Sequence, residues 1–278
     1  MSGDVTTTSV KFARRLLQRK FRITTGEFLV EGVQSVREAV RSGAARLVMA
    51  TPQAAQQFPE LVAAGYSRLA PDQVRDLTDT VTPQGIFAIC RTPSWSMDDA
   101  VGPSACLVVI CAQVRDPGNL GTVIRCADAF GADGVVVTGG SVDVTNPKTV
   151  RASVGSIFHL PVVWGADLAA AVSRVRAAGF TVLAADGSGE DLTCVAAAGA
   201  LDTKIAWILG NEAWGLPLAE LALADRVARI PMWGKAESLN LSTAAAVCLY
   251  TTASRQRSVS TDESVRQVRP GSPDPACG

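Results

Sequence analysis

Residues 205–216 read IAWILGNEAWGL, an apolar run of strand length followed by a turn that contains one acid. Residues 227–234 read VARIPMWG, a second apolar strand that its proline and glycine bring to an end. Residues 237–243 read ESLNLST and lead into an alanine-rich helix that we expect over residues 244–253. Two strands therefore end in glycine turns, and the second turn leads into a helix start that carries serine and asparagine.

Such a meeting point suits a nucleotide-like ligand. Open α/β sheets bind their ligands beyond the carboxyl ends of the strands. Backbone groups of the turns can hydrogen-bond an adenine edge, and apolar side chains can cover its two faces. The apolar candidates are Leu209, Ile230, Met232 and Leu239. The alternative is a buried strand pair whose polar residues only cap turns and helices.

The composition describes a chain that can bury a sizeable core. It has 278 residues, of which 47% are hydrophobic and 19% charged, enough for one large domain or two modest ones plus a tail. No apolar run reaches the roughly 18 residues of a membrane span, and the N-terminus lacks the layout of a signal peptide. Seven cysteines without a Cys-x-x-Cys pair favour reduced thiols and a cytoplasmic location.

The charged residues limit the kinds of site that the chain can build. The one histidine, His159, excludes a histidine-rich metal site and would have to serve any Ser-His-Asp triad. We expect it in the core or at its rim, and we predict no metal. The formal net charge is zero, so a nucleic-acid site must arise from local charge.

The N-terminal third predicts a small α/β domain over residues 1–94. It opens with a helical pattern over 11–22 that carries six basic residues and no acid, and we favour RNA contact over a solvated helix face. Strands expected near 26–32, 46–50 and 85–90 then alternate with helices. The basic residues of the first segment are Lys11, Arg14, Arg15, Arg19, Lys20 and Arg22.

A second α/β unit follows a linker expected over 95–104. A continuous apolar strand at 105–112 is typical of a parallel sheet covered on both faces. A glycine turn, a helix over 123–130 and a strand over 135–140 complete a right-handed βαβ unit. The glycine spacing is not Gly-x-Gly-x-x-Gly, which disfavours dinucleotide binding.

Together the motifs resemble one known family. The matching segments read DPGNLGTVIR at 116–125, LGNEAWGL at 209–216, IPM at 230–232 and SLNLSTA at 238–244. They are similar to those of the SpoU/TrmH family of SPOUT RNA methyltransferases, which transfer a methyl group from S-adenosylmethionine (SAM) to a ribose 2′-hydroxyl. The FLVEG and VTPQG runs in the first domain also resemble that family's substrate-binding domain, which is like an RNA-binding ribosomal protein. The resemblance implies a homodimer and a trefoil knot in the catalytic domain, which it places at 104–257.

The resemblance also implies roles for individual residues. It places Asn119 and Arg125 at the reacting ribose, where Arg125 would hold the phosphate and polarise the hydroxyl. Asn119, Ser238 and Asn240 would hydrogen-bond the ribose or orient Arg125, and Glu212 would help to orient the site. The alternative is helix capping alone for Ser238 and Asn240, and capping of its own turn for Glu212. The SAM site would add Gly210, Thr138 and Gly139 to the apolar candidates. The RNA-binding set would add Arg115, Lys148 and Arg151.

We therefore predict a SAM-dependent 2′-O-methyltransferase of ribosomal RNA, with large-subunit RNA favoured. The alternatives are a transfer-RNA methyltransferase and an RNA-binding homologue without activity. A nicotinamide-dinucleotide protein is a third, less favoured reading. Beyond the catalytic domain, residues 258–278 are rich in serine, proline and charge, and we expect them to be a disordered tail.

Overall fold

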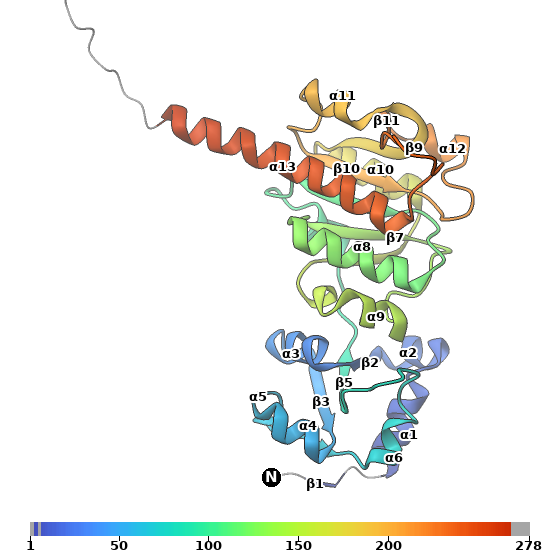
Figure 1. The fold of residues 1–278 in the computed structure, drawn as a ribbon, viewed down its shortest axis with the longest axis vertical. Helices are drawn as coiled ribbons and strands as arrows, with labels where there is room; N and C mark the ends of the chain where they lie inside the picture. The colour runs from blue at the N-terminus through green and yellow to red at the C-terminus, as the bar shows by residue number, and fades with distance from the viewer. Residues whose placement is uncertain (1–2, 5–6, 268–278) are drawn as a thin grey trace, which may run out of the picture.

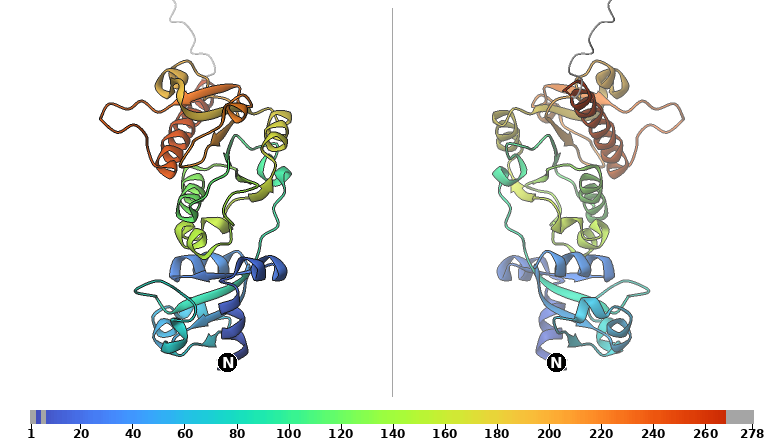
Figure 2. Two further views of the ribbon diagram at one scale, coloured as in Figure 1. Left: turned by 90° about the vertical axis from the view of Figure 1, so that its right-hand side faces the viewer. Right: turned by 90° about the vertical axis from the view of Figure 1, so that its left-hand side faces the viewer.

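Two β-sheets, each sandwiched between helices, follow each other along the long axis of the molecule (Figure 1). The computed structural model describes residues 3–4 and 7–267 of the chain. The N-terminal sheet and its helices form the lower half in Figure 1, and the C-terminal sheet forms the upper half. Side views show the N-terminal helix α3 (Val33–Arg41) directly beneath α9 (Pro147–Ser153) of the upper half (Figure 2).

The N-terminal sheet has five strands in the order β1-β4-β3-β5-β2. One face packs on α1 and α6, and the opposite face packs on α3, α4 and α5. The strands predicted near 26–32, 46–50 and 85–90 are confirmed. The bounds are β1 (Gly3–Asp4), α1 (Thr7–Arg15), α2 (Arg19–Thr25), β2 (Glu27–Glu31), β3 (Ala45–Ala50), α4 (Pro52–Gln57), α5 (Pro59–Val62), β4 (Ser67–Arg68), α6 (Pro71–Val74) and β5 (Ile86–Arg91).

The C-terminal sheet has six strands in the order β11-β9-β10-β6-β7-β8, all parallel as predicted. Helices α8, α9, α11 and α13 cover one face, and α7, α10 and α12 cover the other. The bounds are α7 (Met97–Ala100), β6 (Leu107–Cys111), α8 (Pro117–Phe130), β7 (Gly134–Thr138), η1 (Ser156–Phe158), β8 (Val162–Ala166), α10 (Leu168–Ala177), β9 (Thr181–Asp191), α11 (Leu192–Ala197), β10 (Ile205–Leu209), α12 (Leu218–Leu221), β11 (Arg226–Arg229) and α13 (Leu241–Gln267).

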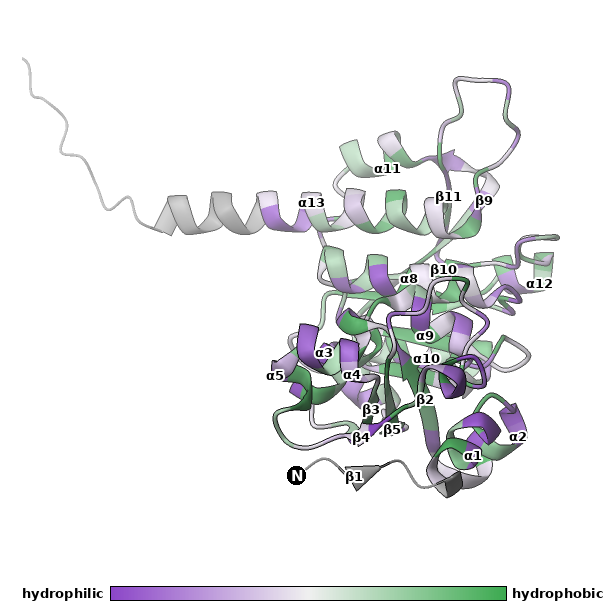
Figure 3. Cartoon of the chain, turned by 60° about the horizontal axis from the view of Figure 1, so that its bottom comes forward, coloured by the Kyte–Doolittle hydropathy of each residue, from purple (hydrophilic) through white to green (hydrophobic). Residues whose placement is uncertain are grey.

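The central strand β10 shows why the sheet needs helices on both faces. Trp207 faces the layer of α8 and α13, whereas Ile208 faces the layer of α10. Both side chains are fully buried, as the continuous apolar run requires. Colouring by hydropathy shows the same pattern, with apolar strands between helices whose outer faces are polar (Figure 3). The indole N–H of Trp207 also donates to Thr252 Oγ1 at 3.0 Å and so ties α13 to the sheet.

Two helices are longer than the sequence predicted. Helix α8 begins at Pro117 rather than at Val123, because Asp116 caps it and proline is favoured in the first turn. Helix α13 runs from Leu241 to Gln267, well past the predicted end at residue 253. The expectation of a disordered tail from residue 258 is therefore wrong as far as 267, and residues 268–278 lie outside the described part. Among the described helices, none combines the length and apolar character needed to cross a membrane.

Other expected boundaries also differ. The basic helix expected over 11–22 is broken into α1 and α2, because the chain turns at Leu16–Gln18 to bury Leu16. Strand β11 ends at Arg229, so Ile230 lies in the following loop. The linker at 95–104 contains the short helix α7, whose Ala100 packs under the large sheet.

The two halves share one hydrophobic core. A single cluster of buried residues includes Phe28 and Val36 from the N-terminal half and Val123 and Trp207 from the C-terminal half. The rings of Phe28 and Phe158 stack across the boundary with centroids 6.0 Å apart. A Cβ atom on Gly155 would lie 2.8 Å from a side-chain carbon of Glu38 on α3, so the two halves touch too closely for any larger residue there.

His159 forms a polar bridge at the same boundary. Its Nδ1 lies 2.7 Å from a carboxylate oxygen of Asp128 on α8, and its Nε2 lies 3.3 Å from Glu38 on α3. The expected position at the rim of the core is confirmed, since the side chain is 39% exposed. Partial burial lowers the pKa of His159, but the hydrogen bonds and charges of the two carboxylates outweigh it and leave the pKa raised.

Replacing His159 with Gln should change how stability depends on pH. Because the folded-state pKa is raised, the bridge stabilises the fold fully below the ordinary histidine pKa of about 6.5 and is lost as pH rises through the folded value. Thermal unfolding followed by circular dichroism should show H159Q to be less stable than the wild type at about pH 6 and equally stable at about pH 9. A difference that persists unchanged at high pH would contradict the bridge.

Candidate active site

A chain of side-chain hydrogen bonds joins three elements beyond the carboxyl ends of β6 and β10. Asn119, in the first turn of α8, donates from Nδ2 to Glu212 Oε1 at 3.0 Å. Asn240, immediately before α13, donates from Nδ2 to Asn119 Oδ1 at 3.0 Å. The structure therefore brings together three of the five predicted catalytic residues, and each of the two bonds joins positions more than 90 residues apart in sequence.

Glu212 is held in its ionised form by the start of α8. The backbone N–H groups of Arg115 and Asp116 each donate to its carboxylate at 3.2 Å. Partial burial raises the pKa of Glu212, but the hydrogen bonds from Asn119 and from backbone N–H groups outweigh it and lower the pKa. A carboxylate with a lowered pKa is a weak base, so the geometry suits orientation of neighbouring amides better than proton removal.

Two residues that the sequence analysis left without a role support this chain. Asp116 accepts from the backbone N–H of Asn119 at 2.8 Å and pairs with Lys148 Nζ at 2.9 Å. Asn211 is buried and donates from Nδ2 to the backbone carbonyl of Gln113 at 2.7 Å, which joins the two turns. An aspartate directly before a proline signals a helix cap and could have revealed Asp116; nothing in the local sequence pairs Asn211 with Gln113.

Asn240 also caps α13, so capping and site building are not exclusive. Its Oδ1 accepts from Ser242 at 2.9 Å to the backbone nitrogen and 2.6 Å to Oγ. Ser238 is exposed, and the structure gives its side chain no partner among the described residues. Asn240 is therefore fixed by hydrogen bonds, whereas Ser238, which was predicted to act with it, is exposed and makes none with the described residues.

Arg125 stands apart from the hydrogen-bonded chain. Six residues separate it from Asn119, which places it roughly 120° around α8 and about 9 Å further along the axis. Its side chain is exposed and makes no hydrogen bond or ion pair with any residue that the structure describes. Within one copy of the chain, Arg125 does not contact the other predicted catalytic residues.

The predicted cofactor residues flank the same place. Gly210 follows β10, and a Cβ atom there would lie 2.5 Å from the carbonyl carbon of Gly215, so only glycine allows the turn to close. No backbone N–H of residues 232–239 donates to another backbone atom of the described chain. Met232 is 38% exposed in this loop, and Ile230 and Leu239 are half-buried. Free backbone donors beside apolar side chains fit an adenine ring and its edge.

Three other cofactor candidates are less available. The side chain of Leu209 is buried in the core, and its carbonyl already accepts from Ala112 at 2.8 Å. Thr138 is buried, and its hydroxyl accepts from the backbone of Gln113 at 3.1 Å. Gly139 donates its backbone N–H to Ala166 at 2.8 Å. These residues form part of the protein framework beneath the site, and the polar groups named here are already used in hydrogen bonds within the protein.

Several predicted RNA-binding residues are used inside the protein. Arg22 is buried with 3% of its side chain exposed, so its assignment to a basic RNA-facing surface is wrong. Arg151 pairs with Glu31 and with Asp79, both at 3.0 Å, and so lies at the boundary between the halves. The residues that remain exposed are Arg14, Arg15, Arg19, Lys20, Arg115 and Lys148, of which Arg14 pairs with Asp76 and Lys148 with Asp116.

A parallel sheet with glycine turns at its carboxyl edge and a polar hydrogen-bonded chain there define an α/β methyltransferase of the SPOUT class. The family model described as the SpoU rRNA methylase family matches residues 106–250. A second, described as an MRM3-like substrate binding domain, matches residues 7–88. The chain belongs to the SpoU rRNA methylase family and is a SAM-dependent RNA methyltransferase.

Curated relatives and solved structures agree with this membership. The chain is 36% identical over 245 residues to the 23S rRNA (guanosine(2553)-2′-O)-methyltransferase RlmP of Bacillus subtilis, which covers 87% of this chain and 94% of the relative. It is 34% identical to the 23S rRNA (uridine(2479)-2′-O)-methyltransferase of Streptomyces viridochromogenes, over 86% of each chain. The crystal structure of AviRb from the same organism, in complex with AdoMet, superposes with a TM-score of 0.78 at 31% identity, over 91% of this chain and 99% of that one.

Within residues 3–4 and 7–267, no group of three or more His, Cys, Asp and Glu side chains is arranged to hold a metal ion. The loop 230–240 and the turn at Gly210 instead offer backbone donors and apolar side chains, which fit SAM. SAM bound there would supply a methyl group on a sulfonium, already activated for transfer. Residues of this chain would supply binding and alignment.

Asn119→Ala should reduce methyl transfer without preventing SAM binding. The substitution removes a hydrogen bond to a charged carboxylate and leaves Asn240 without its acceptor, a loss of about 1.5–3 kcal/mol that corresponds to about 10- to 100-fold in rate. Single-turnover transfer from labelled SAM, beside SAM affinity by calorimetry, measures both effects. Asp167→Ala, which removes the cap of α10 on the opposite face of the sheet, is the matched control, and equal losses in the two variants would argue against the chain.

Proposed function

We propose that this enzyme methylates a ribose 2′-hydroxyl in large-subunit ribosomal RNA, with SAM as the donor. The observation that carries the proposal is the hydrogen-bonded chain of Glu212, Asn119 and Asn240 at the carboxyl edge of the parallel sheet. The two curated relatives similar over most of this chain are both named as 2′-O-methyltransferases of 23S rRNA, which supports this substrate over transfer RNA.

The chemistry needs alignment and a path for one proton. The sulfonium methyl is already activated, so the enzyme must present the hydroxyl in line with it. Glu212, ionised and fully engaged, orients Asn119 and Asn240, whose remaining amide groups can hold the ribose. Arg125 keeps its proton at any ordinary pH and serves best by holding the adjacent phosphate and polarising the hydroxyl. Ser238, whose side chain is exposed and bonds to no described residue, is the further group that we assign to the ribose.

The N-terminal part, residues 1–94, would bind the RNA, and residues 104–257 would carry out the transfer. Helix α2, with exposed Arg19 and Lys20, lies on the same side of the molecule as α12 beside the site (Figure 1). Two further exposed cations lie close to the site. Lys148 on α9 pairs with Asp116, and the backbone of Arg115 donates to Glu212. Such cations would position the RNA through its phosphates rather than read its sequence.

The enzyme would act as a homodimer. Arg125 is too far around α8 to join Asn119 of its own chain, so a second copy must supply it if both act on one ribose. Helices α8 and α13 form a shallow hollow of about 340 Å³ in which Phe130 packs edge-on against Tyr250, itself 61% exposed. An exposed aromatic side chain beside a hollow suits the centre of a protein interface. The six cysteines that the structure describes are free thiols, which supports work in the cytoplasm.

Transfer of tritium from labelled SAM should identify the substrate. Purified enzyme is offered ribosomal RNA, intact ribosomal subunits and transfer RNA separately, and label resistant to alkaline cleavage at a single position of large-subunit RNA is expected. Arg125→Ala should abolish this label and leave SAM binding intact, and Arg125→Lys should not restore it, because a single ammonium lacks the planar fork. Label confined to transfer RNA would reject the substrate. Label in no pool, despite SAM binding, would favour the inactive RNA-binding homologue.

Mixing two inactive variants tests whether a site is shared. If Arg125 of one copy serves Asn119 of the other, refolding R125A together with N119A should restore about a quarter of the wild-type activity, because half of the dimers are mixed and each holds one intact site. Analytical ultracentrifugation of Tyr250→Arg should show loss of the dimer. A mixture as inactive as its components, in a sample shown to exchange subunits, would place Arg125 and Asn119 in the same subunit.

A further inference from the structure

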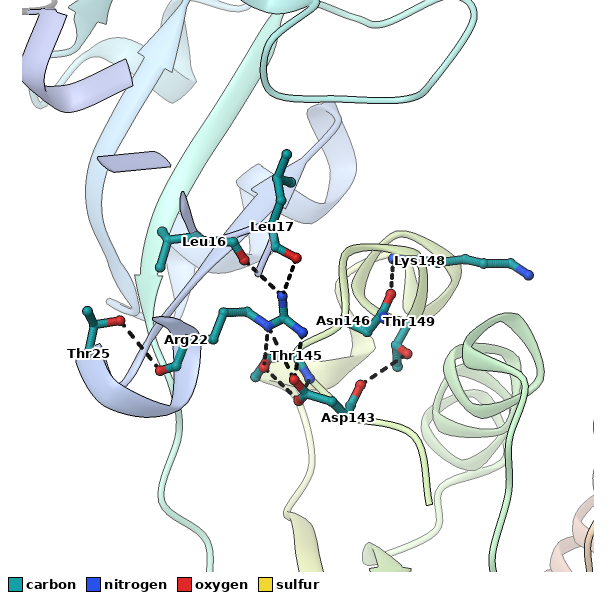
Figure 4. A network of polar contacts seen from close by, with 9 residues as sticks. All are labelled: Leu16, Leu17, Arg22, Thr25, Asp143, Thr145, Asn146, Lys148 and Thr149. Atoms are coloured by element: carbon teal, nitrogen blue, oxygen red, sulfur yellow. Dashed lines mark hydrogen bonds and ion pairs between the residues drawn. The ribbon is translucent and has the colours of Figure 1, made fainter. Parts of the chain in front are cut away.

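Arg22 is a buried cation whose hydrogen bonds connect the two halves of the molecule. Its Nη1 donates at 2.9 Å to the backbone carbonyls of Leu16 and of Leu17, where the chain turns between α1 and α2. On the other side, Nη2 donates to Asp143 Oδ2 at 2.7 Å, and Nε lies 3.2 Å from both Asp143 and Thr145. Figure 4 shows the guanidinium between the two elements.

The geometry of this buried contact is more constrained than that of the apolar contacts at the boundary. A guanidinium is planar and donates in a fixed fork, so its acceptors on both sides must keep their relative angles. The apolar core and the stacked rings of Phe28 and Phe158 hold the halves together, but hydrophobic attraction is non-directional and sets an angle less strictly than a hydrogen-bonded fork does. The pair of Arg151 with Asp79 is more exposed, since 83% of the aspartate side chain faces solvent. Arg22 is therefore the contact best suited to fixing an orientation.

The acceptors of Arg22 lead directly to the reaction site. Asp143 Oδ1 accepts from the backbone N–H and the hydroxyl of Thr145, at 2.9 and 2.8 Å. The carbonyl of Asp143 accepts from Thr149 of α9 at 3.4 Å, and so joins the turn to that helix. The next residue back along α9, Lys148, pairs with the carboxylate of Asp116.

Asp116 closes the connection, because the same carboxylate caps α8 and holds the backbone of Asn119. Hydrogen bonds therefore connect the turn before α2 to the first turn of α8, and the one covalent link among them is between Lys148 and Thr149, which are neighbours in α9. A shift of the N-terminal half would therefore have to break Arg22 from Asp143 or move the start of α9, and with it Lys148, relative to α8.

A buried ion pair adds little net stability, because removing its charges from water offsets much of their attraction. We propose that Arg22 is a positioning residue that fixes the N-terminal half relative to the methyl-transfer site and thereby selects which ribose of the bound RNA is methylated. The inference rests on the proposed RNA methylation. It adds that the choice of nucleotide depends on the angle between the halves as well as on the RNA-contacting residues.

The first test maps the methylated nucleotide. Wild type, Arg22→Ala, Arg22→Lys and Asp143→Asn are compared for SAM affinity, for KM and kcat with RNA, and for the labelled position at nucleotide resolution. We expect unchanged SAM affinity, a kcat for the correct ribose at least about tenfold lower in R22A, and label on neighbouring riboses. R22K should not restore the wild-type position, because an ammonium has too few donors to span both halves. Arg37→Ala, which breaks an exposed ion pair within the N-terminal half, is the matched control.

A second measurement does not depend on activity. Spin labels carried by unnatural amino acids at exposed Gln57 and Ala197, one in each half, report the distance distribution between the halves. We expect R22A to widen it and R37A to leave it unchanged. Where R22A does not fold, Thr145→Val removes only one acceptor of Arg22 and should widen the distribution by less.

The outcomes separate the two proposals. A folded R22A with the wild-type distance distribution overturns the positioning role, and so does methylation of the wild-type nucleotide at the wild-type rate. A wild-type enzyme that methylates no RNA overturns the proposed function instead. In that case the distance measurement alone decides whether Arg22 fixes the angle between the halves.

Discussion

The site depends on one carboxylate held at the beginning of a helix. Glu212 lies in the turn after β10, and its carboxylate accepts hydrogen bonds from Arg115, Asp116 and Asn119 where α8 begins. The first turn of a helix presents unpaired N–H groups and a partial positive charge, so an anion is stable there. Because β6 and β10 are neighbours in the sheet, the two turns emerge side by side and this contact can form. The position of Asn240, and with it the start of α13, follows from it.

The same arrangement divides the reaction between groups with different properties. The amides of Asn119 and Asn240 are neutral, oriented by a charge, and fixed by the helices that carry them. Arg125 is charged and exposed, and it pairs with no residue in the part of the chain that the structure describes, which would suit a group that meets a phosphate arriving from solvent.

The sequence allowed the parallel sheet, the order of its βαβ units and the three residues of the hydrogen-bonded chain to be predicted, because apolar runs and motifs are local signals. It misplaced the start of α8 and the end of α13, since helix limits depend on caps and on packing such as that of Trp207 on Thr252. It also assigned Arg22 to the RNA surface. A basic residue among five others shows no local sign that Asp143, 121 positions later, will bury it. Contacts between distant segments leave no periodic pattern in the sequence from which they could be predicted.

Because the two halves share one continuous core, the RNA would have to change its shape on binding more than the protein does. A cluster that runs from Phe28 to Trp207 cannot be opened without exposing apolar surface on both sides, and the close approach of Gly155 to α3 leaves no room for a hinge there. The shared core keeps the two halves together, and Arg22 is proposed to set the angle between them, so the RNA would have to fit that arrangement. If α2 binds RNA as proposed, the reacting ribose would lie at the edge of the sheet while the flanking RNA reaches α2. Unpaired RNA, whose nucleotides can be turned outward, meets that demand more easily than a regular duplex.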